Sequence, residues 1–372
     1  MLRLYCLLFS DLKLMFNMKK FSPLSGMLFL AVAGATATST ALAATSQPKA
    51  CLDQFYQNTA PELQRESLKK DTTALCLNGF NAMHSGVSKT SFWVAEYLTP
   101  ERLSVKIKRE DSFHEEDLVK GARATLKDYR GSGYDRGHMA PNADMPTKAA
   151  QHDSFSLANM VPQTPQNNQQ VWRELEEGVR AVVTKQKQDV YVVTGPEYSG
   201  KNIKRLGDGL LVPTATYKAI YAPQTGVIGA YYVSNDMNVA KPKVELMSIC
   251  ALEQKIGINL FPKLSDAEKR KVYDLPLNAS AVKANQTIGL KSTDQKSNCA
   301  APVSTQQINA TKKLFKPSAS YEGTMEEVLA KKPQQDVSTP EPQAKADTSS
   351  TESSGILKII LEIVQFIVQL LK

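Results

Sequence analysis

The chain has 372 residues, of which 42% are hydrophobic and 22% charged, and its formal net charge is +8 at pH 7. This length allows one large core or two modest ones and decides little else. The first 43 residues contribute +3 of the charge and the remainder +5. So mild a basic bias fits a polyanionic partner, whose phosphates supply most non-specific affinity, but an ordinary soluble protein can carry it too.

The first 43 residues have the three regions of a secretory signal peptide. A basic start at 18–20 (Met-Lys-Lys) precedes an apolar run at 27–33 and a small-residue end, Ala-Leu-Ala, at 41–43. We expect cleavage before Ala44 and an exported protein that is periplasmic, bound at the cell surface or secreted. Residues 1–17 precede the second start-like methionine, and we interpret them as an over-extended start; the alternative is a longer basic region of the signal.

Removal of this signal deletes Cys6 and leaves four cysteines, Cys51, Cys76, Cys250 and Cys299. An even number of cysteines in an exported chain favours disulfides over metal sites. Sequence proximity suggests Cys51 with Cys76 and Cys250 with Cys299, one of three connectivities, and four free buried thiols are the alternative. The chain has no Cys-x-x-Cys or paired-histidine spacing that would indicate zinc.

The middle of the chain mixes strand and helix patterns. We expect a stapled, partly helical segment at 51–76, a strand at 91–98, a polar stretch at 101–133, mostly loop at 138–168, a helix at 169–185, a strand at 189–196, a hairpin of 210–221 with 227–234, and a helix at 246–255 that ends at Gly257. These elements predict an α+β domain with an antiparallel sheet.

The stretch from 134 to 168 carries side chains suited to a one-metal phosphodiesterase. His138, in the heptapeptide Asp-Arg-Gly-His-Met-Ala-Pro at 135–141, is the candidate general base because the unperturbed pKa of histidine, ~6.5, lies near neutral pH. Asn168 is the candidate ligand of Mg2+, an ion that keeps most of its waters and accepts few protein oxygens. A helix N-cap is the structural alternative for Asn168.

Three side chains beyond Asn168 share one face of the expected helix. Trp172, Glu176 and Arg180 recur every four residues, and we expect this face to look at the metal. Taken alone, Glu176 and Arg180 could form an exposed ion pair worth only ~0.3–0.5 kcal/mol. For Trp172 we favour a role in packing.

The heptapeptide at 135–141, followed by Asn159-Met-Val-Pro-Gln at 159–163 and by Asn168, Trp172 and Glu176, closely resembles the DNA/RNA non-specific endonucleases, the sugar-non-specific family with a ββα-metal finger. The resemblance covers roughly residues 51–262. It implies a ββα-metal nuclease fold with a central antiparallel sheet flanked by helices, and a metal-dependent endonuclease that hydrolyses DNA and RNA to 5'-phosphate products.

The resemblance also implies a role for each matched residue. His138 is the general base, Asn168 is the direct protein ligand of Mg2+ (with Mn2+ as a substitute ion), and Glu176 holds metal-bound water. The resemblance also implies that Arg109 and Arg180 hold phosphate while Asn159 and Arg136 help to build the site. Near Arg109 the segment 113–117 carries an extra residue relative to the family pattern. For Asp135 we favour a local salt bridge with Arg136 that fixes the loop.

Two other function classes remain open at this point. The first is a non-catalytic, envelope-attached nucleic-acid receptor with the same fold, against which the intact His138 and Asn168 argue. The second is a phosphodiesterase of another type that needs no metal ion, which would remain active in EDTA. No small-molecule cofactor is expected.

The C-terminal part departs from the pattern of a folded domain. We place the endonuclease domain at 44–320, a disordered linker at 321–354 and an amphipathic helix at 355–372. The linker is too polar to bury enough apolar surface to offset the entropy cost of ordering it. In that helix Lys358, Glu362, Gln365, Gln369 and Lys372 form one polar stripe on an otherwise apolar surface. Membrane-interface binding, self-association and docking onto the nuclease domain are the three alternatives, in that order of preference.

Overall fold

The computed structural model describes residues 51–323. The expected signal peptide, the linker from residue 324 onward and the expected helix at 355–372 lie outside the described residues. The strands are β1 Glu62–Leu63, β2 Thr72–Leu77, β3 Phe80–Ser85, β4 Thr90–Leu98, β5 Asp135–His138, β6 Met160–Gln163, β7 Val190–Glu197, β8 Arg205–Leu206, β9 Leu210–Leu211, β10 Ala215–Ala222, β11 Val227–Ser234, β12 Val244–Met247, β13 Ile258–Asn259, β14 Lys271–Tyr273 and β15 Leu290–Thr293. The α-helices are α1 Pro100–Ser104, α2 Leu126–Tyr129, α3 Lys148–Ser154, α4 Arg173–Gln186, α5 Ile249–Ile256, α6 Asp266–Lys269 and α7 Thr305–Lys312.

A seven-stranded sheet in the order β12-β11-β10-β7-β4-β3-β2 forms the centre of the fold. All its neighbouring strands are antiparallel. β7 and β10 are rich in β-branched and aromatic residues and are almost wholly buried, as expected for central strands covered on both faces. The expected α+β class with a central antiparallel sheet is confirmed.

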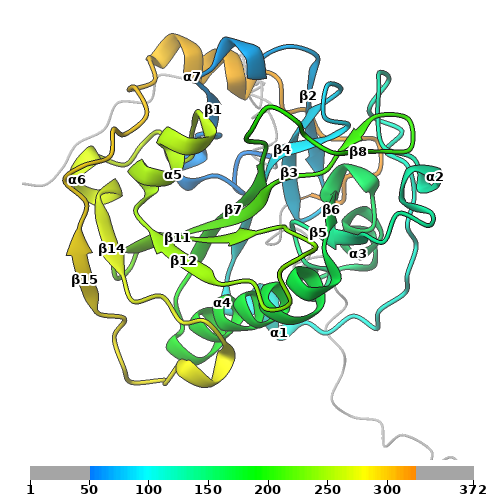
Figure 1. Cartoon of the computed structure of the whole chain (residues 1–372). Helices are drawn as coiled ribbons and strands as arrows, with labels where there is room; N and C mark the ends of the chain where they lie inside the picture. Colours follow the sequence, from blue (N-terminus) through cyan, green and yellow to red (C-terminus); the bar gives the residue numbers. More distant parts are fainter. Residues whose placement is uncertain (1–50, 324–372) are drawn as a thin grey trace, which may run out of the picture. The chain divides into compact units, whose positions relative to one another are not determined.

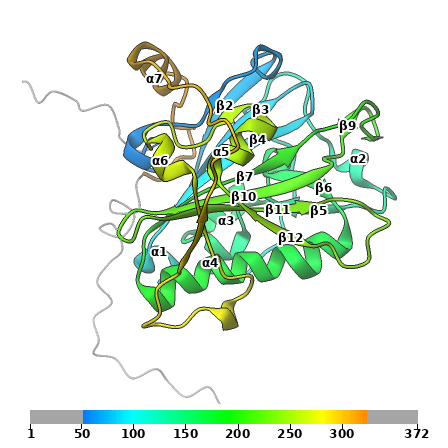
Figure 2. The same cartoon turned by 60° about the vertical axis from the view of Figure 1, so that its left-hand side comes forward.

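The two faces of the sheet carry different layers, as the edge-on view in Figure 2 shows. Because side chains alternate along a strand, β10 sends Tyr217 and Ala219 into a core with α5, and Ile220 into a core with α4. Helix α4 contributes Leu175 and Val179 to the second core. The sheet therefore fixes the position of α4, which begins beside the candidate site.

A ββα unit is built on the α4 side. Strands β5 and β6 pair antiparallel, with His138 opposite Met160, and a continuous helical stretch from 165 to 186 follows β6. The prediction that 138–168 is mostly loop was wrong, because α3 and β6 lie within it. Apolar side chains of the segment 138–168, including Met139, pack in a third core with Phe80 and Val94, and the prolines and polar residues of this segment mask that signal.

The N-terminal described segment also differs from expectation. Residues 51–76 contain short 3-10 turns, but the segment ends in β2, which pairs with β3 at the edge of the sheet. The polar residues at 81, 84 and 85 are buried in β3, so this strand lacks the alternation that would have predicted it. Of the other strands of this sheet, β4, β7, β10 and β11 were predicted, although the expected hairpin begins only at Ala215. Residues 246 and 247, which were expected to begin a helix, belong to β12 instead, and α5 starts at Ile249.

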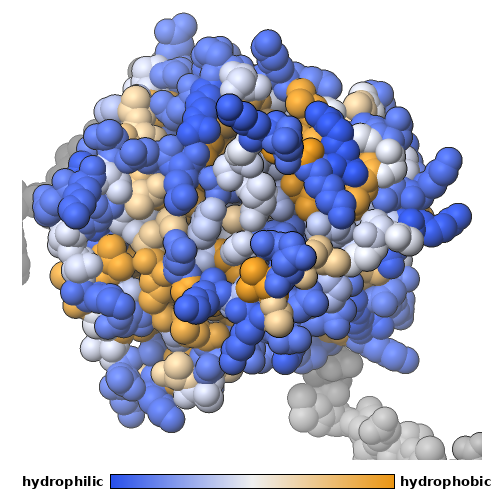
Figure 3. Space-filling model, in the orientation of Figure 1, coloured by the Kyte–Doolittle hydropathy of each residue, from blue (hydrophilic) through white to orange (hydrophobic). Residues whose placement is uncertain are grey.

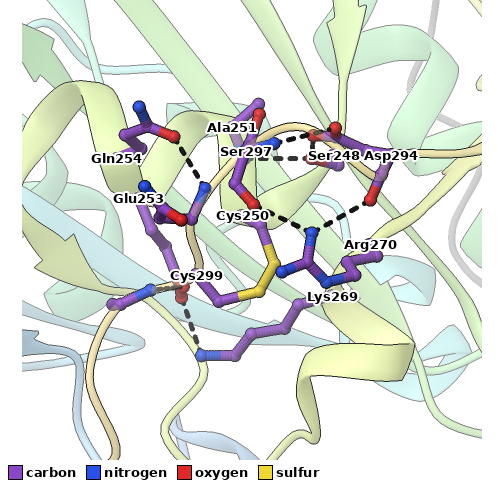
Figure 4. The surroundings of a disulfide bond; sticks show 12 residues. Ser248, Cys250, Ala251, Glu253, Gln254, Lys269, Arg270, Asp294, Ser297 and Cys299 are labelled. Atoms are coloured by element: carbon purple, nitrogen blue, oxygen red, sulfur yellow. Dashed lines mark hydrogen bonds and ion pairs between the residues drawn. A yellow bond between two sulfur atoms is a disulfide. The ribbon is translucent and has the colours of Figure 1, made fainter.

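Both expected disulfides, Cys51–Cys76 and Cys250–Cys299, are present. Figure 4 shows the second one, which ties α5 to the segment after β15. Next to it the buried Glu253 carboxylate accepts hydrogen bonds from Lys269 Nζ at 2.9 Å and from the backbone N–H of Ala300 at 3.1 Å. Together the disulfide and the buried ion pair fix the course of the chain as it leaves the sheet.

The face of the molecule shown in Figure 3 is mainly hydrophilic, with scattered apolar areas. One hollow of about 620 Å³ lies between Gln186 and the segment 274–289, and it shares no lining residue with the candidate site. Within residues 51–323, no helix has both the length and the apolar character needed to cross a membrane.

Candidate active site

Asn168 lies in an unusual turn at the start of the long helical stretch. Thr164 caps this stretch, since its Oγ1 accepts from the backbone N–H of Asn167 at 3.2 Å, and Pro165 occupies the first helical position, where a missing N–H costs nothing. Residues Asn167–Trp172 are π-helical before α4 begins. Asn168 therefore sits inside a π-helical turn, a feature often found at functional sites, and is not the N-cap.

His138 ends β5, and a buried asparagine holds the chain that follows. Asn159 Oδ1 accepts from the backbone N–H of Ala140 at 2.9 Å, and its Nδ2 donates to the carbonyl of Ala140 at 2.8 Å. The carbonyl of Asn159 also accepts from the N–H of Met139 at 2.9 Å. Asn159 is fully buried and does not line the pocket, so it positions the His138 segment and does not touch a substrate there.

A pocket of about 570 Å³ brings the other expected residues together. Of the seven residues expected in the site, the six that line it are Arg109, Arg136, His138, Asn168, Glu176 and Arg180. They come from four regions: the segment before α2, strand β5, the π-helical turn and helix α4. The structure therefore brings six of the seven expected residues into one pocket, even though residues 109 and 180 are far apart in the chain.

The ring of His138 is enclosed by aromatic side chains. Its centroid lies 5.2 Å from that of Phe155 and 6.0 Å from that of Phe113. Its Nε2 atom is buried and has no hydrogen-bond partner among residues 51–323. Burial lowers the pKa of His138 to about 3, and the positive charge of Arg109 acts in the same direction. The imidazole is therefore neutral at pH 7 and has a lone pair that can accept a proton.

Asp135 has a different partner from the one expected. Its Oδ2 accepts from Asn168 Nδ2 and from Gln169 Nε2, both at 2.9 Å. The guanidinium of Arg136 instead lies 3.8 Å from the centroid of the Phe113 ring. The prediction of an Asp135–Arg136 salt bridge was therefore wrong, and the motif aspartate orients the candidate metal ligand.

Glu176 and Arg180 occupy the expected face of α4, where Arg180 pairs with a residue from another segment. Arg180 Nη1 lies 3.0 Å from Oδ1 of the buried Asp144. Burial raises the pKa of Glu176 to about 7, against the nearby positive charges of Lys218 and Arg180. The face expected to look at the metal thus presents a carboxylate whose charge a cation would stabilise and an arginine held in place by Asp144.

Arg109 is the most exposed of the arginines expected in the site. Its Nε lies 2.6 Å from Asp111 Oδ1, and both side chains are 57% exposed. The guanidinium carbon is also 5.2 Å from the centroid of the Phe155 ring. Arg109 therefore lies at the mouth of the pocket, above the aromatic side chains that enclose His138.

The residues present fit a hydrated Mg2+ ion. Because Asn168 Nδ2 is engaged by Asp135, the amide oxygen Oδ1 is left to accept a ligand, and Glu176 adds a second hard oxygen donor to the same pocket. Within residues 51–323 no group of three or more His, Cys, Asp or Glu side chains could hold a metal ion. Mg2+ suits the observed set because it binds through one or two protein oxygens and retains its waters.

Comparison with known proteins places the chain in a family. A family profile described as DNA/RNA non-specific endonuclease matches residues 53–267, which is more than half of the chain. The chain belongs to the DNA/RNA non-specific endonuclease family. The endonuclease match includes β5, β6, the π-helical turn and α4, and hence the whole ββα unit.

Individual relatives cover this endonuclease region to different extents. The mitochondrial nuclease of Saccharomyces cerevisiae is 33% identical over 218 residues, 51% of this chain and 66% of that protein. Human mitochondrial endonuclease G is 40% identical over 152 residues, 37% of this chain and 51% of that protein. Nuclease C1 of Cunninghamella echinulata var. echinulata is 33% identical over 235 residues, 57% of this chain and 89% of that protein. The chain thus spans about half to two-thirds of the first two relatives.

Among solved structures, a chain from a crystal structure of the EndoG/EndoGI complex matches 51% of this chain and 86% of its own length. Its sequence identity is 26% and the TM-score is 0.42.

Sequence reasoning missed three residues that support the endonuclease site. Asp144 forms an ion pair with Arg180, and the Phe113 ring packs against the guanidinium of Arg136. The third residue, Lys218, is buried beneath the site. Lys218 lies in a strand without any motif, and Asp144 lies in a polar segment that was expected to be loop. Phe113, four residues after Arg109, lay in the segment 113–117 that was compared with the family pattern, but it was given no role there.

Proposed function

We propose that this protein is an exported, Mg2+-dependent endonuclease that hydrolyses phosphodiester bonds of DNA and RNA to 5'-phosphate products. The observation that carries this proposal is the pocket in which His138, Asn168 and Glu176 meet Arg109, Arg136 and Arg180. A neutral imidazole, hard oxygen donors and guanidinium groups are the side chains that phosphodiester hydrolysis requires.

His138 is the general base in this mechanism. Its neutral imidazole accepts a proton from the attacking water. The low pKa in the free protein limits its basicity, but a bound phosphate brings negative charge close to Arg109 and Arg136 and therefore raises the pKa of His138. Substrate binding thus raises the pKa of His138 toward neutral pH when the base is needed.

Arg109, Arg136 and Arg180 hold the phosphate oxygens. A guanidinium group can donate two parallel hydrogen bonds to one phosphate. Arg136 is braced by the Phe113 ring and Arg180 by Asp144, so both are oriented before substrate arrives, whereas Arg109 is exposed at the mouth of the pocket. Contacts to phosphate carry no information about base or 2'-hydroxyl, which agrees with activity on both DNA and RNA.

Asn168 would hold the metal ion, and Glu176 would hold the water that hydrates it. Asp135 fixes the orientation of Asn168 through the Oδ2 contact, as residues behind a metal ligand commonly do. When bound, Mg2+ supplies electrostatic stabilisation of the charge that develops on the phosphate oxygens and the leaving 3'-oxygen. Lys218 and Arg180 beside Glu176 keep this carboxylate from becoming an isolated buried charge.

Export and the role of the C-terminal helix are also proposals. The pattern at 18–43 supports export, and the two disulfides fit an oxidising compartment. The stripe of polar residues at 355–372 supports a tether to a membrane interface or a contact with a second copy. Deleting 355–372 should move the protein from the membrane fraction to the soluble one without changing its cleavage rate. An unchanged distribution, with an intact monomer in detergent-free buffer, would reject both roles.

Purified protein from Ala44 onward should cleave supercoiled DNA and RNA with Mg2+ and stop in EDTA. Its products should accept ligation through their 5'-phosphates without kinase treatment. Activity that persists in EDTA would support a metal-independent phosphodiesterase, and binding without cleavage would support the envelope-attached receptor.

A further inference from the structure

Lys218 is a buried charged residue beneath the candidate active site to which the motifs assign no role. It lies in the middle of β10 and is 1% exposed. Its strand neighbours in register are Thr194 of β7 and Tyr231 of β11. Because β10 alternates, Lys218 points to the same face of the sheet as Ile220, which is the face that packs against α4.

The ammonium of Lys218 contacts the chain beside the candidate base. Its Nζ donates to the Met139 carbonyl at 3.3 Å and to Thr194 Oγ1 at 2.8 Å, and it lies 5.4 Å from the centroid of the Trp172 ring. Met139 directly follows His138. A buried ammonium is costly without partners, so these contacts hold Nζ in place and with it the backbone that carries the His138 ring.

Thr216, two residues earlier on the same face of β10, makes a corresponding contact with the metal side of the site. Its Oγ1 lies 3.2 Å from Asn167 Nδ2. Asn167 is fully buried and precedes Asn168 in the π-helical turn. One strand therefore reaches both halves of the ββα unit through two neighbouring inward side chains.

Other charged groups also surround Lys218. Burial raises the pKa values of Glu96 and Glu176, and the positive charge of Lys218 opposes this rise; Arg102, Asp144 and Arg180 complete the set of charged groups. Lys218 could therefore influence the active site in two physically distinct ways. Lys218 can act through the Met139 carbonyl on His138, or through its charge on Glu176 and hence on the metal.

We propose that Lys218 is a positioning residue for His138, and that Thr216 is the corresponding positioning residue for the Asn168 turn. The ammonium fixes the Met139 carbonyl, and the backbone so fixed sets the direction of the His138 ring. This inference rests on the proposed function, because it assigns the two supports to the general base and to the metal ligand of that mechanism.

The test compares Lys218→Met, Lys218→Gln and Thr216→Val in the full chain. Lys218→Met keeps most of the apolar stem and removes the charge and the donor, whereas Lys218→Gln keeps a donor without the charge. Three quantities are measured for each: kcat at saturating Mg2+, the rate at which diethyl pyrocarbonate modifies His138, followed by peptide mass spectrometry, and the affinity for Mn2+ by calorimetry. Cooperative urea unfolding checks that each variant is folded.

For Lys218→Met we expect kcat to fall by about 10- to 100-fold, the cost of a misplaced catalytic group. The rate of His138 modification should rise because the ring is less constrained, and Mn2+ affinity should stay at the wild-type value. Lys218→Gln should lie between Lys218→Met and wild type. Thr216→Val should weaken Mn2+ binding by about 10-fold and leave the modification of His138 unchanged.

The opposite pattern would overturn the inference. If Lys218→Met weakens Mn2+ binding while His138 reacts as in wild type, Lys218 acts through Glu176. Wild-type kcat and His138 reactivity in Lys218→Met would mean that it positions nothing, and if that variant does not fold, Lys218→Gln is judged by the same criteria. Failure of the proposed function would appear separately, as wild-type cleavage in EDTA, while the reactivity of His138 would still test its placement by Lys218.

Discussion

The burial of Glu176 should make the proposed metal binding depend on pH. Burial raises the pKa of its carboxyl group to about 7. Below that pH the protonated form predominates, and a cation must displace the proton, so metal binding releases protons. The concentration of Mg2+ needed for half-maximal cleavage should therefore fall as the pH rises from about 6 to about 8.

This dependence is measured by Mg2+ titrations of cleavage at several pH values. Glu176→Gln, which cannot ionise, should flatten it. Glu174→Gln is the matched control, because Glu174 lies on the same helix, is exposed and does not line the pocket. A wild-type half-saturation value that does not change with pH would show that Glu176 does not take part in holding the ion.

Asp135 allows a second test at the residue scale. Since its Oδ2 accepts from both Asn168 and Gln169, Asp135→Ala leaves the proposed metal ligand, Asn168, in place but removes the contact that orients it. Metal affinity should fall by about 10- to 100-fold, and excess Mg2+ should restore most of the cleavage rate. In Asn168→Ala excess Mg2+ should restore only part of it. Equal behaviour of the two variants in Mg2+ titrations would contradict the assigned roles.

At the scale of elements, sequence patterns predicted the strands and helices whose side chains follow one period. The apolar run in β4 and the β-branched run in β7 are clear, and so is the helix start near α5. Strand β3 was missed because it buries polar residues such as His84, which hide the pattern. The burial of β3 depends on its pairing with β2 and β4, which the sequence of the strand alone does not show.

The candidate site could be predicted in part for the same kind of reason. His138, Asn168 and Glu176 lie in a motif whose order and spacing are visible in the chain, and they line one pocket. Asp144 and Lys218 act through contacts between segments distant in sequence. No local pattern marks such residues, because their role depends on the register of the sheet and on the packing of α4.

Gly137 provides a test of the hairpin that carries His138. A Cβ at this position would overlap the side chain of Gln163, which is fully buried opposite β5. Gly137→Ala should therefore lower the free energy of unfolding by about 1–3 kcal/mol, as overpacking of a core does, and should reduce cleavage by shifting His138. Urea unfolding and kcat measure the two effects.

The matched control is Gly289→Ala. A Cβ there has no heavy atom within 4 Å in the described part of the chain, so stability and cleavage should stay near wild type. If Gly137→Ala were as stable and as active as this control, the close approach of β5 and β6 would not position the base.

At the scale of the whole molecule, the two disulfides should make the stability of the protein depend on an oxidising compartment. They close sequence separations of 25 and 49 residues, and in the chain-entropy model each contributes about 3–4 kcal/mol. Reduction should lower the free energy of unfolding by several kcal/mol, as measured in urea with and without reductant. In the Cys250→Ala/Cys299→Ala double variant, only the contribution of Cys51–Cys76 should remain sensitive to reductant. Free thiols at these four positions, found by mass spectrometry of unreduced peptides from exported protein, would contradict this account.

The central claim is that His138 removes the proton from the water that attacks phosphorus. Its most direct test is the cleavage rate of His138→Ala at saturating Mg2+, measured together with nucleic-acid binding and unfolding. The rate should fall by about 10²- to 10⁴-fold or more, while binding and folding stay close to wild type, because the three arginines proposed to hold phosphate and the cores are unchanged. Cleavage by His138→Ala at the wild-type rate would contradict the mechanism.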